Sequence, residues 1–366
     1  MKTLILILTM FPFLLNAQEV SELLQEKLIN DTENPVHGMS FLIERDGDVL
    51  VNEAVGLRKK NGDTLQVTDQ FRIASSTKLF VSTIILQLEE EGKLSLLDTI
   101  YPYLKSIEFL KLDEFHWHKN NAFAKAITIK QLLSHKSGLA DVFNDRQQVL
   151  LERVLKNSQQ QYQPKDVVDW YFEFGLHKEA KFKPGEGWHY SDMNYVLLGF
   201  LIEKLDKKSL SQSIRDRILN PLDMQDTYFE FYEKTHSKNA RIHQYVGATD
   251  FNEVNTSFDW SGGGLVSTHQ DVATFIKALF NGKLISKESL LKMITIEETF
   301  ENHLPYGLGV YESVYNDQTF YGHYGFFGTY IGYCPETKTV LSYCITQAMP
   351  SFNVYEFVNY VVKFVK

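Results

Sequence analysis

The sequence predicts an α+β fold in which strands from both ends of the chain form one antiparallel sheet, helices flank that sheet, and a mostly helical lobe is inserted between its strands. Strand-type alternation with turn signals occurs near residues 39–55 and again after residue 306. Between these regions the apolar residues follow helical spacing. No internal repeat or low-complexity linker divides the chain, so the strands and helices belong to one unit.

Length and composition agree with one large domain made of two lobes. The chain has 366 residues, of which 44% are apolar and 23% charged, as in globular proteins. We expect a single domain over residues 18–366, with a sheet lobe at about 18–95 and 255–366 and a helical lobe at about 96–254. The formal net charge of −9, without a basic block, argues against nucleic acid as a partner.

The first 17 residues have the pattern of a secretory signal peptide. Lys2 gives a positive start, Leu4–Leu15 is an uncharged run of 12 residues, and Ala17 is a small residue before a cut at Gln18. A membrane anchor is the alternative, but the run is shorter than the ~20 residues that cross a bilayer, so no transmembrane segment is expected. Because no cysteine lies near the cut, the predicted destination is periplasmic or extracellular, without lipid attachment.

The elements before the inserted lobe are a helix, a hairpin and a second helix. Val20–Ile29 has the spacing of a short amphipathic helix. Met39–Glu44 and Asp48–Val55 form a hairpin around Asp46-Gly47, a pair that accepts positive φ. Ser76–Glu91 has the apolar spacing of a helix in the core.

Helices continue through the middle of the chain. Thr128–Gln131 and Ser267–Gln270 read as capping boxes, and the second opens a helix at Asp271–Phe280. Another helix is expected at Tyr195–Leu205. The glycine run at residues 262–264 predicts a flexible turn rather than a phosphate loop, because no Gly-Lys-Ser/Thr follows it.

The pattern becomes strand-like after residue 306 and closes with a helix at Val354–Val365. Strands are expected at Leu308–Val314 and Gln318–Tyr321, followed by a hairpin of Thr329–Cys334 and Thr339–Thr346.

The two cysteines fall in this last hairpin and are expected to be free, buried thiols. Cys334 is predicted opposite Thr339, which places Cys344 five residues further along, or ~17 Å at ~3.4 Å per residue. A disulfide tolerates at most ~7 Å between Cα atoms.

The first motif that carries chemistry is Ser75-Ser76-Thr77-Lys78. Residues three apart share a helix face, so the serine hydroxyl can lie within reach of the lysine amine. A lysine desolvated beside a serine can lose its proton and act as a base. The same spacing at Ser289–Lys292 lies inside an ordinary amphipathic helix and needs no function.

The second motif is Tyr190-Ser191-Asp192, just before the helix at Tyr195. The tyrosine can relay a proton or stabilise the lysine. The alternative is a helix N-cap, in which Ser191 or Asp192 caps and Tyr190 packs.

The third motif, His323-Tyr324-Gly325, is placed between strands near the C-terminus. The histidine can hold a substrate carboxylate or polarise the tyrosine, and the glycine lets a substrate backbone approach a strand edge.

In this order the three motifs resemble the serine β-lactamase and penicillin-binding protein superfamily, and most closely its branch of class C β-lactamases, D-Ala-D-Ala carboxypeptidases and esterases. The similarity runs from about residue 35 to 350. It also includes the segments Phe71–Ser75, Gly92–Leu96, Ile127–His135, Asn194–Gly199 and Gly322–Gly325. The resemblance implies a β-lactamase/transpeptidase-like fold and chemistry without a cofactor.

The resemblance also implies roles for single residues. Ser75 matches the nucleophile that is acylated, Lys78 its general base, and Tyr190 the tyrosine that shuttles protons. The oxyanion hole of the family would here use the backbone N–H groups of Ser75 and Phe326.

Two departures from the family pattern bear on the substrate. His323 and Gly325 match the third motif, but as His-Tyr-Gly rather than Lys-Thr-Gly, which weakens the case for a β-lactamase proper. Asp192 stands where many members have asparagine. Its negative charge either favours a cationic substrate group or pairs with Lys78, and the sequence leaves both open.

Two further features have weaker functional interpretations. His116 and His118 could ligate zinc, but no partner ligand accompanies them, so no metal is expected. Aromatic residues gather beside the motifs, either as an apolar subsite or as packing between the lobes. They are Trp188, Tyr190, Tyr306, Tyr324, Phe326 and Phe327.

These observations predict a secreted serine hydrolase that acts through a Ser75 acyl-enzyme on an ester or a D-amino-acid-type amide or peptide. A β-lactamase proper is one alternative. A penicillin-binding or sensor protein that holds ligand without turnover is the other. The expected partner is a small molecule or peptide, and the sequence leaves the substrate and the oligomeric state open.

Overall fold

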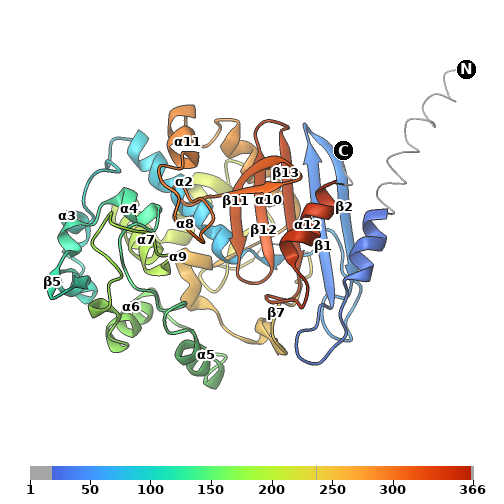
Figure 1. Cartoon of the computed structure of the whole chain (residues 1–366), viewed down its shortest axis with the longest axis horizontal. Coiled ribbons are helices and arrows are strands. Elements are labelled where there is room, and N and C mark those ends of the chain that lie inside the picture. Colours follow the sequence, from blue (N-terminus) through green and yellow to red (C-terminus); the bar gives the residue numbers. More distant parts are fainter. Residues whose placement is uncertain (1–18, 236, 364–366) are drawn as a thin grey trace, which may run out of the picture.

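The computed structural model describes residues 19–235 and 237–363, so the predicted signal peptide lies outside the described residues. Its centre is a six-stranded antiparallel sheet, with strands in the order β10-β11-β12-β13-β1-β2 (Figure 1). The strands are β1 (Gly38–Arg45), β2 (Asp48–Gly56), β10 (Tyr311–Tyr315), β11 (Gln318–Gly325), β12 (Thr329–Cys334) and β13 (Thr339–Ile345). The prediction of one sheet from both ends of the chain is confirmed.

Pairing between β1 and β13 joins the two ends of the chain. Met39 lies opposite Ile345 and Arg45 opposite Thr339. Both strands are buried along almost their whole length, as expected of strands covered on both faces. The β1–β2 turn has positive φ at Asp46 and Gly47, as the hairpin prediction requires.

Helices cover both faces of the sheet. Alternate residues of β1 point to opposite sides: Phe41 packs in a core with α12 (Val354–Lys363) and the helix at residues 19–26, whereas Leu42 packs in the larger core on the other side. In that larger core α10 (His269–Phe280) lies against β12 and β13. It also contacts α11 (Lys287–Ile294).

The inserted lobe is mostly helical and lies beside the sheet (Figure 1). Its helices are α3 (Tyr101–Leu104), α4 (Ile129–Leu133), α5 (Gln147–Lys156), α6 (Pro164–Glu173), α7 (Asp192–Asp206), α8 (Leu210–Ile214), a π-helical turn (Arg215–Leu219) and α9 (Trp260–Gly263). A small sheet of β3 (Phe71–Arg72), β9 (Leu265–Ser267) and β6 (Tyr228–Phe229) joins the lobes. Two short hairpins pair β4 (Trp117–His118) with β5 (Asn121–Ala122) and β7 (Tyr245–Val246) with β8 (Thr249–Asp250).

Helix α2 (Thr77–Glu90) runs through the middle of the molecule and is buried on nearly every side. A helix that is apolar all round belongs in a core. Its Phe80 stacks on Phe275 of α10 with ring centroids 3.8 Å apart, and it also packs against α7 and α9. The start of α2 is thereby held close to the start of α7, which brings the first two motifs together.

Several predicted boundaries shift. The first helix ends at residue 26 because Ile29 pairs with Val36 as an isolated bridge. The second capping site lies one residue later than expected: the Thr268 side chain accepts from the Asp271 N–H, so the helix begins at His269. The third motif ends strand β11 and does not lie between strands.

Both cysteines are free and buried, as expected. Cys334 lies opposite Thr339, and Cys344 lies opposite Thr329 at the other end of the β12–β13 pair. They also face different cores, Cys334 towards α12 and Cys344 towards α10. In the described part of the chain, no helix is both long enough and apolar enough to cross a membrane.

Candidate active site

Ser75 lies in a single 3-10 turn, Ala74–Ser76, between strand β3 and helix α2. Ala74 has φ +46°, a left-handed conformation that costs energy for a residue other than glycine. Strand β3 is fixed by pairing with β9, and α2 begins at Thr77. The sharp turn therefore places Ser75 on a rigid support rather than on the first turn of α2.

Lys78 is completely buried and its amine has three acceptors. Its Nζ lies 3.1 Å from Ser75 Oγ, 2.5 Å from Asp192 Oδ1 and 2.8 Å from the carbonyl oxygen of Gly262. An ammonium has three N–H donors, so these contacts match a protonated lysine with every donor used.

Asp192 begins α7 and pairs with Lys78, which is the second of the two roles that the sequence left open. Its backbone N–H donates to Asp141 Oδ1 at 2.8 Å. Burial, and then the charge of Asp192, raise the pKa of Asp141 to about 8. The Asp141 carboxyl group and the start of α7 therefore lie in direct contact.

Tyr190 lies over the Lys78 amine, with Nζ 5.0 Å from the centre of the ring. Burial, and then the charge of Asp192, hold the pKa of Tyr190 well above its usual value, while hydrogen bonding to Ser75 acts in the opposite direction. The phenol is therefore neutral and carries a proton. The capping alternative is not observed, because Ser191 makes no cap bond and its hydroxyl donates to the Ala140 carbonyl.

His323 is buried and has both ring nitrogens engaged. Nδ1 lies 2.7 Å from the Tyr324 carbonyl, which can only accept, so Nδ1 carries the proton. Nε2 then accepts from the Tyr306 hydroxyl at 3.2 Å. Burial and the charge of Lys78 lower the pKa of His323 to about 3. The expectation that His323 holds a carboxylate is not supported, because the ring is neutral and its donor is used.

Gly325 lets strand β11 approach the segment that precedes Ser75. A Cβ at this position would lie 2.4 Å from the Ile73 carbonyl oxygen and 2.1 Å from Thr329 Oγ1. The missing side chain therefore lets the end of β11 approach the segment before Ser75, which differs from the expected role at a strand edge.

Two backbone N–H groups are available beside Ser75. Within the described part of the chain, neither the Ser75 N–H nor the Phe326 N–H donates a hydrogen bond. Both residues line the cavity. Free donors at these two positions match the oxyanion hole that the family resemblance implies.

These residues open onto a cavity of about 610 Å³. Of the predicted site residues, Ser75, Tyr190, Asp192, His323, Gly325 and Phe326 line it, and Lys78 lies just behind them. Of the predicted aromatic group, Tyr306 lies outside the cavity lining, while Trp188, Tyr190, Tyr324, Phe326 and Phe327 line it. A large part of the lining is apolar and includes Phe143, Leu150, Leu151, Val154, Phe251 and Phe258.

Sequence reasoning missed two members of the site. The glycine run predicted as a flexible turn is buried, and its first two residues end helix α9, whose Gly262 carbonyl binds Lys78. Asp259, just before that helix, lines the cavity. The glycine run is visible in the sequence, but its role in the site depends on contacts with Lys78 and Asp192, which are distant in sequence.

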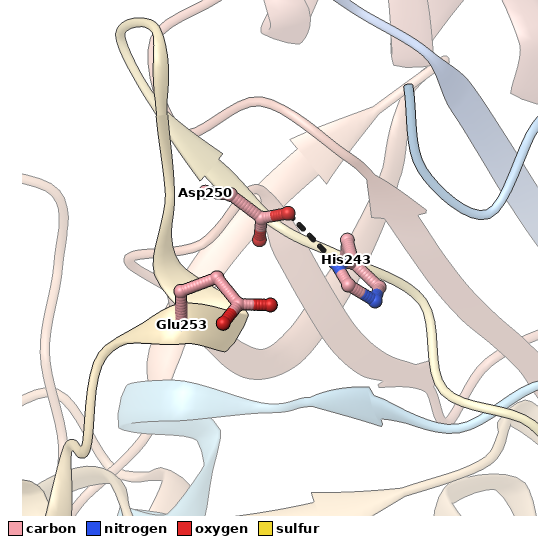
Figure 2. A group of neighbouring side chains, drawn as sticks. All are labelled: His243, Asp250 and Glu253. Carbon is pink, nitrogen blue, oxygen red and sulfur yellow. Dashed lines mark hydrogen bonds and ion pairs between the residues drawn. The ribbon is translucent and has the colours of Figure 1, made fainter. Parts of the chain in front are cut away.

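Possible metal ligands lie away from the cavity. His118 donates through Nδ1 to a backbone carbonyl at 3.0 Å, and His116 is buried. Among the described residues, three ligand atoms come within 4.8 Å of one another at His243, Asp250 and Glu253 (Figure 2). The His243 Nδ1 is hydrogen-bonded to Asp250 Oδ2 at 2.7 Å, and Figure 2 shows Nε2 on the side of the ring away from Asp250. The contact between His243 and Asp250 is therefore explained as an ordinary histidine–carboxylate hydrogen bond.

Comparison with known proteins gives one sequence family and several structural neighbours. The family described as "Beta-lactamase" matches residues 20–358. Protein flp of Staphylococcus aureus (strain MW2) is 30% identical over 254 residues, which are 67% of this chain and 46% of flp. The chain thus spans about half the length of the curated relatives it matches.

Two solved structures show the same fold at low sequence identity. D-amino acid amidase from Ochrobactrum anthropi SV3, complexed with L-phenylalanine amide, has a TM-score of 0.77 and 23% identity, covering 96% of this chain and 98% of the amidase. EstCE1, described as a hydrolase with promiscuous acyltransferase activity, has a TM-score of 0.77 and 17% identity, covering 97% and 98%.

The hydrogen bonds of His323 predict a ring that stays neutral over the ordinary pH range. With the pKa of His323 at about 3, its ring nitrogens should show no titration between pH 5 and pH 8. ¹⁵N-histidine NMR measures this, with the resonance assigned by its loss in His323→Asn. An imidazolium signal from His323 above pH 5 would contradict the arrangement.

Proposed function

The chain belongs to the beta-lactamase family, and on that premise we propose that it is a serine hydrolase that acts through an acyl-enzyme on Ser75. Its substrate class is an ester or an amide or peptide of D-amino-acid type. The observation that carries this proposal is the contact of Lys78 Nζ with Ser75 Oγ at 3.1 Å, at the edge of a cavity with two free N–H donors.

In acylation Ser75 Oγ attacks the substrate carbonyl and its proton passes to Lys78. The contacts of Lys78 match an ammonium, so the lysine must first give up a proton. The Asp192 carboxylate at 2.5 Å is the adjacent acceptor. The negative oxygen of the tetrahedral intermediate lies between the N–H groups of Ser75 and Phe326, and such donors contribute ~2.7–4 kcal/mol each in acyl transfer.

Tyr190 completes the proton path. Because its pKa is raised, the hydroxyl is protonated and can donate to the leaving group rather than act as the first base. The bond from the carbonyl carbon to the leaving group breaks as that proton is transferred, and Lys78, which lies beside the Tyr190 ring, passes on the proton taken from Ser75 to restore the Tyr190 hydroxyl. Water then attacks the acyl-enzyme by the reverse path, and Ser75 is released with its proton.

The substrate class rests on the cavity and on the structural neighbours. One neighbour is a D-amino acid amidase and another is the hydrolase EstCE1. The large apolar wall suits an acyl or side-chain group. A β-lactamase proper is disfavoured, because a neutral His323 replaces the lysine of Lys-Thr-Gly and supplies no charge for a drug carboxylate.

Removing the Ser75 hydroxyl should abolish turnover of p-nitrophenyl esters. We expect Ser75→Ala to lower kcat/KM by roughly a thousand-fold or more, because the nucleophile is lost. The matched control is Ser289→Ala, which removes the serine of the second Ser-x-x-Lys pattern and should keep activity. Full activity in Ser75→Ala would sink the proposal. Stable labelling of Ser75 by a fluorescent penicillin, without release or ester turnover, would instead support a ligand-holding protein.

A chromogenic cephalosporin should be hydrolysed slowly or not at all, whereas short-chain esters or D-amino-acid amides are turned over. The reason is the neutral, fully engaged His323 ring at the position of the family's lysine. A substrate panel with Ser75→Ala as background measures this. Cephalosporin turnover faster than ester turnover would favour the β-lactamase alternative.

The proposal includes export, which rests on the sequence of residues 1–17 alone. A protein produced from the full gene should begin at Gln18 and appear in the periplasmic or extracellular fraction. N-terminal sequencing after fractionation measures both. An intact N-terminus in the cytoplasmic fraction would contradict this part of the proposal.

A further inference from the structure

Asp259 is a carboxylate in the cavity wall that the mechanism above does not use. Within the described part of the chain, its side chain accepts no hydrogen bond and joins no ion pair. Buried and half-buried charges are ordinarily paired, so a carboxylate that faces a cavity without a partner marks a place for a ligand.

The position of Asp259 is close to the nucleophile turn. A Cβ built on Gly263 would lie 3.5 Å from Asp259 Cγ and 3.4 Å from the backbone carbonyl carbon of Ala74. The carboxyl group and the residue before Ser75 therefore flank the same small space, which exists because position 263 is glycine. A substrate whose carbonyl lies at Ser75 has its neighbouring atoms within reach of this space.

The backbone next to Asp259 is strained and is held in that conformation by packing. The next residue, Trp260, has φ +30° although it is not glycine. Its indole is buried, lies tilted against Phe200 with ring centroids 4.8 Å apart, and occupies the room that Gly199 leaves. Strained conformations of this kind persist only where packing enforces them, and they gather at functional sites.

The cations near Asp259 already have other partners. Arg72 is paired with Glu230 at 2.7 Å, and Lys78 is paired with Asp192. Burial and the charges of Asp192 and Glu230 outweigh the attraction of Arg72 and Lys78, and they raise the pKa of Asp259 to about 7. A bound cation would supply the counter-charge that the protein does not.

An apolar pocket adjoins the carboxylate. Phe258, the preceding residue, lines the cavity with Phe143 from the helical lobe, their ring centroids 6.0 Å apart. Leu150 and Val154 of α5 add to this wall. The cavity thus offers an unpaired carboxyl group near the turn that holds Ser75, together with a large apolar surface.

We propose that Asp259 binds the ammonium group of the acyl part of the substrate, so that the enzyme selects esters and amides of free-amine, large apolar amino acids over N-blocked or amine-free ones. This inference rests on the proposed function for its catalytic consequence, but the binding site itself can be tested without turnover.

The test compares two ligands of similar size, 2-phenylethylamine and 2-phenylethanol, by isothermal titration calorimetry on the whole protein. At pH 8, where Asp259 is ionised, we expect the amine to bind about ten-fold more tightly than the alcohol. At pH 5.5 the preference should shrink, because Asp259 is then mostly protonated while the amine remains cationic. A wild-type protein that binds both ligands equally at pH 8 would overturn the proposal.

Variants then assign the preference to one residue. Asp259→Asn should reduce the ratio of the two affinities to near one, whereas Asp63→Asn, which removes the same charge from an exposed site, should leave it unchanged. Retention of the amine preference in Asp259→Asn would also overturn the proposal. If amine binding is seen but no ester or amide is hydrolysed, the site stands and the proposed hydrolase activity fails, so the two failures are distinguishable.

Discussion

The buried Lys78 amine is the group on which the rest of the site depends. A cation taken out of water is costly unless charge and hydrogen bonds replace its hydration, and here one carboxylate, one hydroxyl and one carbonyl do so. These acceptors come from three separate parts of the chain: the turn before α2, the start of α7 and the end of α9. Satisfying one ammonium therefore fixes the relative positions of the proposed nucleophile, the proposed proton relay and the cavity wall.

The three acceptors of Lys78 can come together because segments of backbone approach one another unusually closely around the site. Gly325 allows β11 to approach the Ile73 carbonyl, and Gly262 leaves room for the Asp192 carboxylate, which would lie 2.6 Å from a Cβ there. Ala74 and Trp260 have positive φ angles of +46° and +30° although neither is glycine. The energetic cost of these conformations is met by the packing of α2, which is buried along most of its length, and of the strands around it.

Much of the fold was predictable because its signals are local. Alternation and the Asp46-Gly47 turn identify the first hairpin, and the Ser75–Lys78 spacing identifies the candidate nucleophile and base. The remainder depends on contacts between distant residues. The neutral state of His323 follows first from burial of its ring and then from the charge of Lys78, and the role of the glycine run follows from its contact with Lys78. No short window of sequence contains such information.

The pairing of β1 with β13 also bears on when the candidate site can assemble during synthesis of the chain. Gly38 and Thr346, which hydrogen-bond across this pair, are 308 residues apart in sequence. Contacts of such long range form slowly, and a growing chain cannot form them until its last strand has emerged. A nascent chain that ends before Gly325 also lacks the strand end that packs against the nucleophile turn. Incomplete chains therefore carry Ser75 and Lys78 without an assembled candidate site, and the proposed activity has to wait until translation is nearly finished.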